Sequence, residues 1–311
     1  MITSPTDVLC PICGSGETGI KFRLPPVIIR ACRGCGHRFQ YPVPSEEVLD
    51  TIFAGLYNGD LKIISKYFPE WKGFYTGRNE DQNKTHCLEI IRRRLRLAER
   101  FIAPGKLLDI GCGFGQFLQI ARERGWDAGG VEPSPPAIAY IREKLGLEVV
   151  ETLPDDLRSY RLITMWDVLE HQSTPWAFLE KLARSVSPGT VLALTVPNRR
   201  CFLTWLAELF WIISRGRIRT PFSKFYFITH LQYFSRTGIR ALLERAGFEI
   251  LLTSEEDTCL RNLDLGWMMK AALRVLFALN GLFGARNRLL IYARLILLPS
   301  APPLQHSNTP G

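Results

Sequence analysis

Residues 106–197 alternate between short apolar runs and amphipathic stretches, and this alternation constrains the fold more than any other feature. Amphipathic helices are predicted over 115–125, 134–146 and 174–189. Near-continuous apolar strands joined by such helices indicate a doubly wound α/β fold with a mostly parallel sheet covered on both faces. The predicted strands are KLLDI (106–110), AGGVE (128–132), LEVVE (147–151), RLITMW (161–166) and TVLALTV (190–196).

A glycine-rich loop follows the first predicted strand. In LLDIGCGFG (107–115), Asp109 precedes three glycines at alternate positions, Gly111, Gly113 and Gly115. In such a sheet ligands bind beyond the carboxyl ends of the strands, and a backbone without Cβ atoms lets a ligand touch the main chain. The spacing is G-x-G-x-G, which differs from the G-x-G-x-x-G of dinucleotide sites and disfavours a nicotinamide enzyme.

A second acidic residue, Glu132, ends the second predicted strand. Its carboxylate is placed to accept hydrogen bonds from both hydroxyls of a ribose, while Asp109 can meet an ammonium group. These residues together predict a ligand that is a nucleoside carrying an amino acid and no phosphate.

With Glu132, four stretches carry a family resemblance over roughly 106–254: LLDIGCGFGQFL, MWDVLEHQSTP (165–175), LTVPN (194–198) and HLQYFSRTGIRALLERAGFEI (230–250). The chain resembles the class I S-adenosylmethionine-dependent methyltransferases. The resemblance implies a seven-stranded Rossmann-like sheet, an enzyme of the transferase class and S-adenosyl-L-methionine as cofactor. It also implies that Asp109, Gly111, Gly113 and Gly115 hold the methionine end, Glu132 the ribose, Glu151 and Thr152 the adenine edge, and that Asp167 lies near the methyl group.

Candidate catalytic residues cluster after the fourth predicted strand. Asp167, Glu170 and His171 are closely spaced, and His230 lies downstream. The set resembles the divalent-metal site of some small-RNA and quinone-pathway methyltransferases, where Mg²⁺ or another ion grips the acceptor. Two alternatives stay open: His171, with Asp167, serves as a general base without a metal, or Glu170 and His171 only fix the loop.

The N-terminal 45 residues contain two Cys-x-x-Cys-Gly knuckles, CPICG (10–14) and CRGCG (32–36). Two thiolates at this spacing can bind one tetrahedral ion from a tight turn, so Cys10, Cys13, Cys32 and Cys35 predict a structural zinc ribbon over 1–45. The alternatives are ordinary thiols or a redox pair. His37, next to the second knuckle, is expected to be a bystander. The knuckles look like the small zinc-binding region that precedes some of these methyltransferases.

Two segments outside the sheet pattern are apolar and basic. Residues 201–228 are predicted to form an acceptor lid, inserted in a cofactor-binding domain over 87–254, whose Arg215, Arg217 and Arg219 meet a phosphate on the acceptor. Residues 255–299 are predicted to be an apolar and basic helical segment. Such surfaces suit peripheral membrane contact; the alternative is that both segments pack on each other and on the sheet.

The rest of the chain adds a connector or lid over 46–86 and a disordered tail over 300–311. The net charge of +9 permits an acidic partner but names none. The N-terminus shows no secretory signal, so the expected location is cytoplasmic, with the peripheral membrane contact as an addition.

The function that these features favour is methyl transfer to a small-molecule, sugar or lipid-linked acceptor. RNA methylation is the alternative that the charge and the knuckles encourage, although DVLEH stands where an NPPY-type motif would be. A non-catalytic adaptor is the third reading, and the intact Asp109, glycine loop and Glu132 argue against it.

Overall fold

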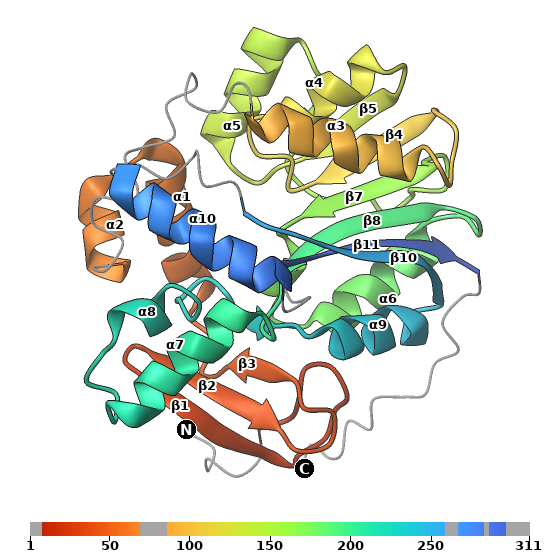
Figure 1. Ribbon diagram of the computed structural model, residues 1–311. Helices are drawn as coiled ribbons and strands as arrows, with labels where there is room; N and C mark the ends of the chain where they lie inside the picture. Colours follow the sequence, from red (N-terminus) through yellow and green to blue (C-terminus); the bar gives the residue numbers. More distant parts are fainter. Residues whose placement is uncertain (1–7, 69–85, 259–266, 283–285, 297–311) are drawn as a thin grey trace.

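The computed structural model describes residues 8–68, 86–258, 267–282 and 286–296 (Figure 1). The strands are β1 (Thr18–Leu24), β2 (Val27–Cys32), β3 (Arg38–Gln40), β4 (Lys106–Ile110), β5 (Asp127–Val131), β6 (Val149–Val150), β7 (Leu162–Trp166), β8 (Val191–Pro197), β9 (Gln232–Tyr233), β10 (Phe248–Glu256) and β11 (Arg288–Leu295). The α-helices are α1 (Glu46–Asn58), α2 (Leu61–Tyr67), α3 (His86–Ala98), α4 (Gln116–Glu123), α5 (Pro135–Tyr140), α6 (Pro175–Ser185), α7 (Phe202–Ile213), α8 (Thr220–Ser223), α9 (Arg236–Arg245) and α10 (Trp267–Leu282), with a π-helical turn over Ile141–Leu145 and a 3-10 turn over Leu169–His171.

The larger sheet has seven strands in the order β10-β11-β8-β7-β4-β5-β6. The pairs β4–β5, β4–β7, β5–β6 and β7–β8 are parallel, and β11 runs antiparallel to both of its neighbours. Helices α3 and α4 lie on one side of this sheet and α6 and α9 on the other (Figure 1). The predicted doubly wound, mostly parallel sheet is therefore confirmed.

Each face of the large sheet has its own apolar core. One core joins the strands to α6 and α9 and includes Trp176, Leu179 and Leu242. The other joins them to α3 and α4 and includes Leu95 and Phe117. Because both faces are covered, the central strands are apolar at nearly every position, as the sequence pattern required.

The prediction of a helical C-terminal segment is wrong for one part. Residues 267–282 form α10, but 288–295 form strand β11, which lies inside the sheet between β8 and β10. Five consecutive residues, Leu289–Ala293, are buried. A strand covered on both faces loses its polar-apolar alternation, so a short run such as RLLIYARL has no period that distinguishes it from a buried helix.

The knuckle region belongs to a second sheet in the order β1-β2-β3-β9. Its last strand, β9, comes from the segment that follows the acceptor-lid region, so distant parts of the chain complete one sheet. Arg245 on α9 donates to the backbone oxygen of Ile12 at 2.7 Å and stacks over Trp176 at 3.8 Å. These contacts tie the knuckles to the core beneath α9.

Some sequence-based predictions lie outside the described residues. They are the disordered tail over 300–311 and the part of the 46–86 connector that follows Phe68 as far as residue 85. In the described part of the connector, α1 begins after Ser45, whose side chain accepts a hydrogen bond from the Val48 amide. Within the described segments, no helix has the length and apolar character needed to cross a bilayer.

Candidate active site

The candidate cofactor residues lie at the carboxyl ends of β4 and β5. Asp109 pairs with Gly130 in the β4–β5 register, and Glu132 follows β5 directly. Gly111 has a φ of +73°, and a Cβ on it would come within 2.7 Å of the Val168 side chain. Gly113 has a φ of +58°, and a Cβ there would meet nothing within 4 Å, so the loop leaves open space beside its backbone.

Glu132 is buried, yet its carboxylate is well supplied with donors. The Gly113 amide donates to Oε2 at 2.8 Å, the Ser134 amide donates to Oε1 at 3.0 Å, and the Tyr57 hydroxyl donates to Oε2 at 3.2 Å. Two backbone amides hold the carboxylate in place, while Tyr57 is a side-chain donor that another hydroxyl can replace. This arrangement fits the predicted ribose contact.

Asp109 is also buried, but among the described residues only the Thr164 hydroxyl donates a hydrogen bond to its carboxylate, at 2.6 Å. Burial raises the pKa of Asp109 to about 7, and the Thr164 hydrogen bond and the Arg94 charge only partly offset it. A carboxylate in this position is stabilised by a cation. The ammonium of an amino-acid ligand would supply one, so the residue fits the predicted role.

Asp167 follows β7 with a φ of +59°, which is uncommon for a residue with a side chain. Its Oδ1 accepts a hydrogen bond from Thr195 at 3.2 Å, and its Oδ2 forms an ion pair with Arg288 at the start of β11. Glu151 and Thr152 are exposed after β6, beside Glu132, whose amide donates to Val150 at 3.0 Å. Their predicted contact with adenine stays a prediction.

Glu170, His171 and His230 come together, with ligand atoms within 4.8 Å of one another. The Glu170 side chain is fully buried, and neither of its carboxylate oxygens has a partner among the described residues. Burial, followed by the nearby Asp167 charge, raises the pKa of Glu170 well above its ordinary value. A buried carboxyl of this kind is stabilised either by a proton or by a cation.

His171 is set up as a proton acceptor. Its Nδ1 lies 2.7 Å from the carbonyl oxygen of Thr229, which can only accept, so Nδ1 carries the hydrogen and Nε2 carries a lone pair. Burial lowers the pKa of His171, which keeps the ring neutral at pH 7. The Phe53 and His230 rings pack on it at centroid distances of 5.4 and 5.0 Å. The same lone pair could serve a base or a metal ligand.

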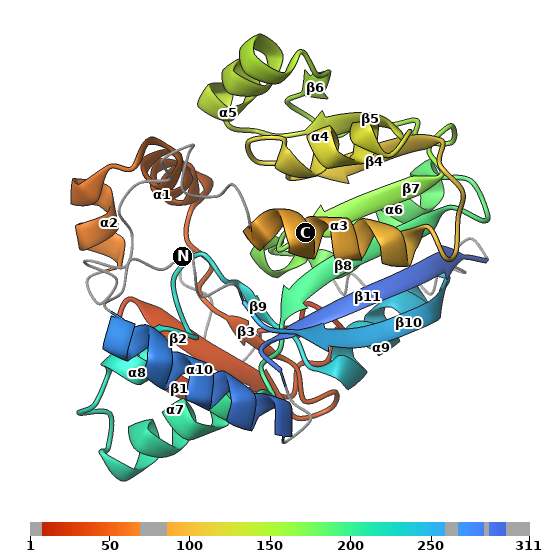
Figure 2. The ribbon, with the colours of Figure 1, turned by 45° about the horizontal axis from the view of Figure 1, so that its top comes forward.

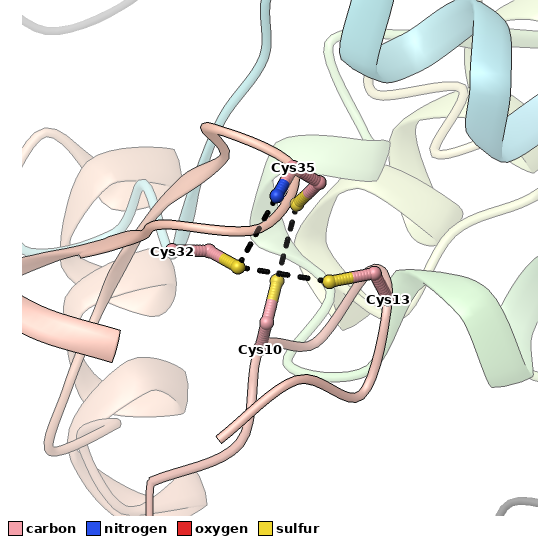
Figure 3. Close-up of side chains that lie close together, drawn as sticks. All are labelled: Cys10, Cys13, Cys32 and Cys35. Atoms are coloured by element: carbon pink, nitrogen blue, oxygen red, sulfur yellow. Dashed lines mark hydrogen bonds between the residues drawn. The ribbon is translucent and has the colours of Figure 1, made fainter. Parts of the chain in front are cut away.

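The four knuckle cysteines converge in space (Figure 3). The Sγ atoms of Cys10 and Cys35 lie 3.6 Å apart, as do those of Cys13 and Cys32. A tetrahedral zinc with Zn–S bonds of about 2.3 Å would place its sulfurs roughly 3.8 Å apart, so the cluster fits a zinc ion. His37 does not belong to this group of four converging side chains, and its Nε2 lies 2.9 Å from Gln232 Oε1.

Three residues of the site were not predicted from the sequence: Tyr57 and Phe53 on α1, and Arg288 on β11. Tyr57 contacts Glu132 and packs on Phe114, and Phe53 packs on His171, so α1 contacts both the candidate cofactor residues and the cluster of Glu170, His171 and His230. The sequence signal for Phe53 and Tyr57 is that two aromatic residues lie four positions apart on a helix that Ser45 caps.

The three lid arginines do not join the cofactor residues. Arg215, Arg217 and Arg219 are exposed, and none makes an ion pair with a residue in the described part of the chain. Their contact with a phosphate group stays a prediction.

Comparison with known proteins places the fold and the site in a family. Residues 82–253, more than half of the 311-residue chain, match the methyltransferase domain family. The chain is 29% identical over 111 residues to the ubiquinone biosynthesis O-methyltransferase of Idiomarina loihiensis, which covers 32% of this chain and 45% of that protein. It is 25% identical over 186 residues to the enzyme of the same name from Azoarcus sp. strain BH72, covering 55% and 78%.

Among solved structures, a SAM-dependent methyltransferase from Archaeoglobus fulgidus aligns with a TM-score of 0.46 and 16% identity, over 69% of this chain and 97% of that one. The chain spans about half of the length of the Idiomarina relative. The family match covers the glycine loop, Glu132 and the Glu170 cluster alike. The chain belongs to the methyltransferase domain family and, by its seven-stranded sheet with a glycine loop after β4, to the class I S-adenosylmethionine-dependent methyltransferases.

Proposed function

We propose that the protein transfers the methyl group of S-adenosylmethionine to a hydroxyl of a small-molecule acceptor. The observation that carries the proposal is the pair of buried carboxylates beside an open glycine loop: Glu132, fixed by two amides, and Asp109, which forms no ion pair with the residues that the structure describes. A sulfonium cofactor with an ammonium and a ribose has the groups that these two residues would bind. The names of the relatives, ubiquinone biosynthesis O-methyltransferases, support oxygen as the acceptor atom.

In this proposal the Glu132 carboxylate would accept hydrogen bonds from both ribose hydroxyls, which would replace the hydrogen bond from the Tyr57 hydroxyl. Asp109 and the loop of Gly111, Gly113 and Gly115 hold the methionine end. Glu151 and Thr152 meet the adenine edge, and the Asp167–Arg288 pair lines the pocket beside the methyl group. The cofactor supplies an electrophilic methyl, so the protein's main tasks are to align the acceptor and to exclude water.

His171 is the proposed general base, because its Nε2 holds a lone pair and its pKa is lowered by burial. It would take the acceptor's proton at Nε2. The cofactor, when bound, would supply the methyl group to the acceptor oxygen and keep the electrons of the broken C–S bond as a neutral thioether. A second candidate role is favoured by the unpartnered oxygens of Glu170: with His171 and His230 they would hold a divalent cation such as Mg²⁺, which would orient adjacent hydroxyls. The four cysteines would hold a structural zinc that takes no part in the reaction.

The acceptor lid proposed over 201–228 would cover a small-molecule, sugar or lipid-linked acceptor, because α7 begins shortly after the end of β8. The test is incubation of the purified protein with methyl-deuterated cofactor and a cell extract, followed by mass spectrometry. The proposal predicts label in a small-molecule fraction that disappears in an Asp109→Asn variant. Label confined to RNA would support nucleic-acid methylation, and absence of cofactor binding would support an adaptor.

A further inference from the structure

The surface formed by α7, α10 and the loop 214–219, called here the α7–α10 face, carries apolar side chains where a water-facing surface would carry polar ones. The two helices lie side by side at one end of the molecule (Figures 1 and 2). Ile213 is 70% exposed, Ile212 59% and Trp205 56%, all on α7, and Trp267 on α10 is 79% exposed. Exposed apolar side chains gathered on neighbouring helices are typical of interaction sites.

Helix α7 has inverted amphipathicity: its polar residues face the protein interior and its apolar residues face outward. Its single charged residue, Glu208, turns inward and accepts hydrogen bonds from Arg38 and from Tyr226, the latter at 2.6 Å. Its single hydroxyl residue, Thr204, is buried. The exposed residues of the helix are all apolar. A helix that faces water places its polar residues outward, so the exposed side of α7 is built for an apolar environment.

The exposed side of α10 has a related composition. Trp267, Met268, Ala271, Arg274, Val275 and Ala278 are exposed, and their spacing places them on one helical face. One of these six residues is charged, and that charge is basic. Tryptophan and basic residues around an apolar face are typical of helices that lie in a membrane interface.

The charge of the loop 214–219, which follows α7, indicates which kind of apolar environment the α7–α10 face contacts. Arg215, Arg217 and Arg219 are exposed beside Ile212, Ile213 and Ile218, and no acidic residue lies in the whole segment 209–229. A dry protein partner would have to pair or desolvate these guanidinium groups, whereas a bilayer places phosphates next to its acyl chains. Apolar tips flanked by arginines therefore match the boundary of an anionic membrane.

We propose that the α7–α10 face binds the surface of an anionic phospholipid bilayer, with the isoleucines of α7 and the tryptophans in the acyl boundary and the three arginines on lipid phosphates. Lipid binding goes beyond the proposed methyl transfer and can be measured without any acceptor. It would bring the lid region to the place where an apolar acceptor is dissolved.

The test is co-sedimentation of the full chain with vesicles of phosphatidylcholine plus phosphatidylglycerol, compared with phosphatidylcholine alone. The expected result is binding to the anionic vesicles that weakens as salt rises. An Ile212→Glu, Ile213→Glu variant is expected to partition at least about tenfold more weakly, since two apolar side chains become charged. Replacing the three arginines by Gln is expected to weaken partition by about fivefold for each arginine.

Ile296→Glu is the matched control, because Ile296 is 50% exposed but follows β11 at the end of that strand opposite Arg288. It is expected to bind like wild type, and each variant is checked for intact folding by titration with S-adenosylmethionine. Wild-type protein that stays in the supernatant at low salt would overturn the proposal, as would an isoleucine double variant that binds normally.

Two further outcomes would also overturn it. Inorganic phosphate that displaces the protein more strongly than chloride at the same ionic strength would assign the arginines to a soluble phosphate. A concentration-dependent dimer that the isoleucine double variant abolishes, without vesicle binding, would assign the face to a second copy of the chain.

Discussion

Two clusters of side chains that could hold a metal ion differ in their sets of ligand atoms. The cysteine cluster consists of four sulfurs with pairs at 3.6 Å, drawn from two knuckles of identical pattern. The Glu170 cluster mixes one carboxyl with His171 and His230 and lies beside Asp167 at the cofactor edge. A complete sulfur shell suits an ion that stabilises the fold, whereas a mixed and incomplete shell leaves room for a substrate and suits catalysis.

The largest expected effect concerns the cysteine cluster. A Cys10→Ser, Cys32→Ser variant is expected to lose nearly all of its bound zinc, and the free energy of unfolding should fall by several kcal/mol, because metal binding of this kind is folding free energy. Cys10 is part of the core that joins the knuckles to α9, so the loss should spread there. Metal analysis and thermal unfolding measure it.

Cys201→Ser is the control, because the buried Cys201 thiol lies outside the cysteine cluster and is hydrogen-bonded to the Thr204 hydroxyl. It should keep its zinc. Full zinc content in the double variant would show that the knuckles are not the binding site and would remove the contrast between the two clusters.

The next largest effect concerns the catalytic cluster. His171→Ala is expected to lower kcat by a factor of about 10²–10⁴, the usual contribution of a general base, while the Kd for the cofactor stays nearly unchanged. His171→Asn places an amide nitrogen near the position of Nδ1, so it keeps a donor for the Thr229 carbonyl but cannot accept a proton. If the Asn variant recovers most of the activity, His171 positions the loop and is not a base.

Treatment with a mild chelator distinguishes the two clusters by how tightly each would hold its ion. With His171 as a metal-free base, chelator-treated protein should keep its turnover within about twofold and its zinc entirely, because a sulfur shell holds zinc far more tightly than a carboxyl and two imidazoles hold Mg²⁺. Turnover that falls on treatment and returns with Mg²⁺, with the zinc unchanged, would assign the Glu170 cluster to a divalent cation instead.

The smallest expected effect is a pH dependence set by Asp109, whose pKa burial raises from 3.8 to about 7. The folded, unliganded protein therefore holds a proton that the unfolded chain releases near pH 4, and the stability this gives is lost as pH rises through about 7. A cationic ligand needs the ionised form. Its Kd should therefore be about tenfold higher at pH 5.5 than at pH 7.0, where the ligand's ammonium is still charged.

The control for this prediction is Asp109→Asn, which should bind more weakly with a nearly flat profile over the same range. A wild-type profile that is equally flat would mean that Asp109 does not meet the ligand's cation.

The sequence predicted those parts of the site that are local along the chain. Asp109, the glycines and Glu132 stand at the ends of strands whose apolar runs are evident, and parallel strands bring their ends to one edge. The knuckle cysteines were predictable for the same reason, since two residues of each pair share one turn. Prediction of the close approach of Glu170, His171 and His230 depended on the family resemblance, because His230 lies next to β9, far along the chain from Glu170.

What the sequence could not predict depends on packing between distant elements. Strand β11 is buried on both faces, so its composition carries no period, and Arg288 was therefore not placed next to Asp167. Tyr57 reaches Glu132 only because α1 packs near α5, and nothing in the sequence of α1 names that neighbour. The inverted amphipathicity of α7 likewise depends on a distant element, because Glu208 faces inward to pair with Arg38 of β3.

Calorimetric titration of wild type and Glu132→Ala tests most directly whether Asp109 and Glu132 bind S-adenosylmethionine. Wild type is expected to bind saturably, and the variant is expected to lose about 1–3 kcal/mol, the cost of removing charge-assisted hydrogen bonds to the ribose. Equal affinity of the two proteins, or no binding by wild type, would contradict the proposed binding.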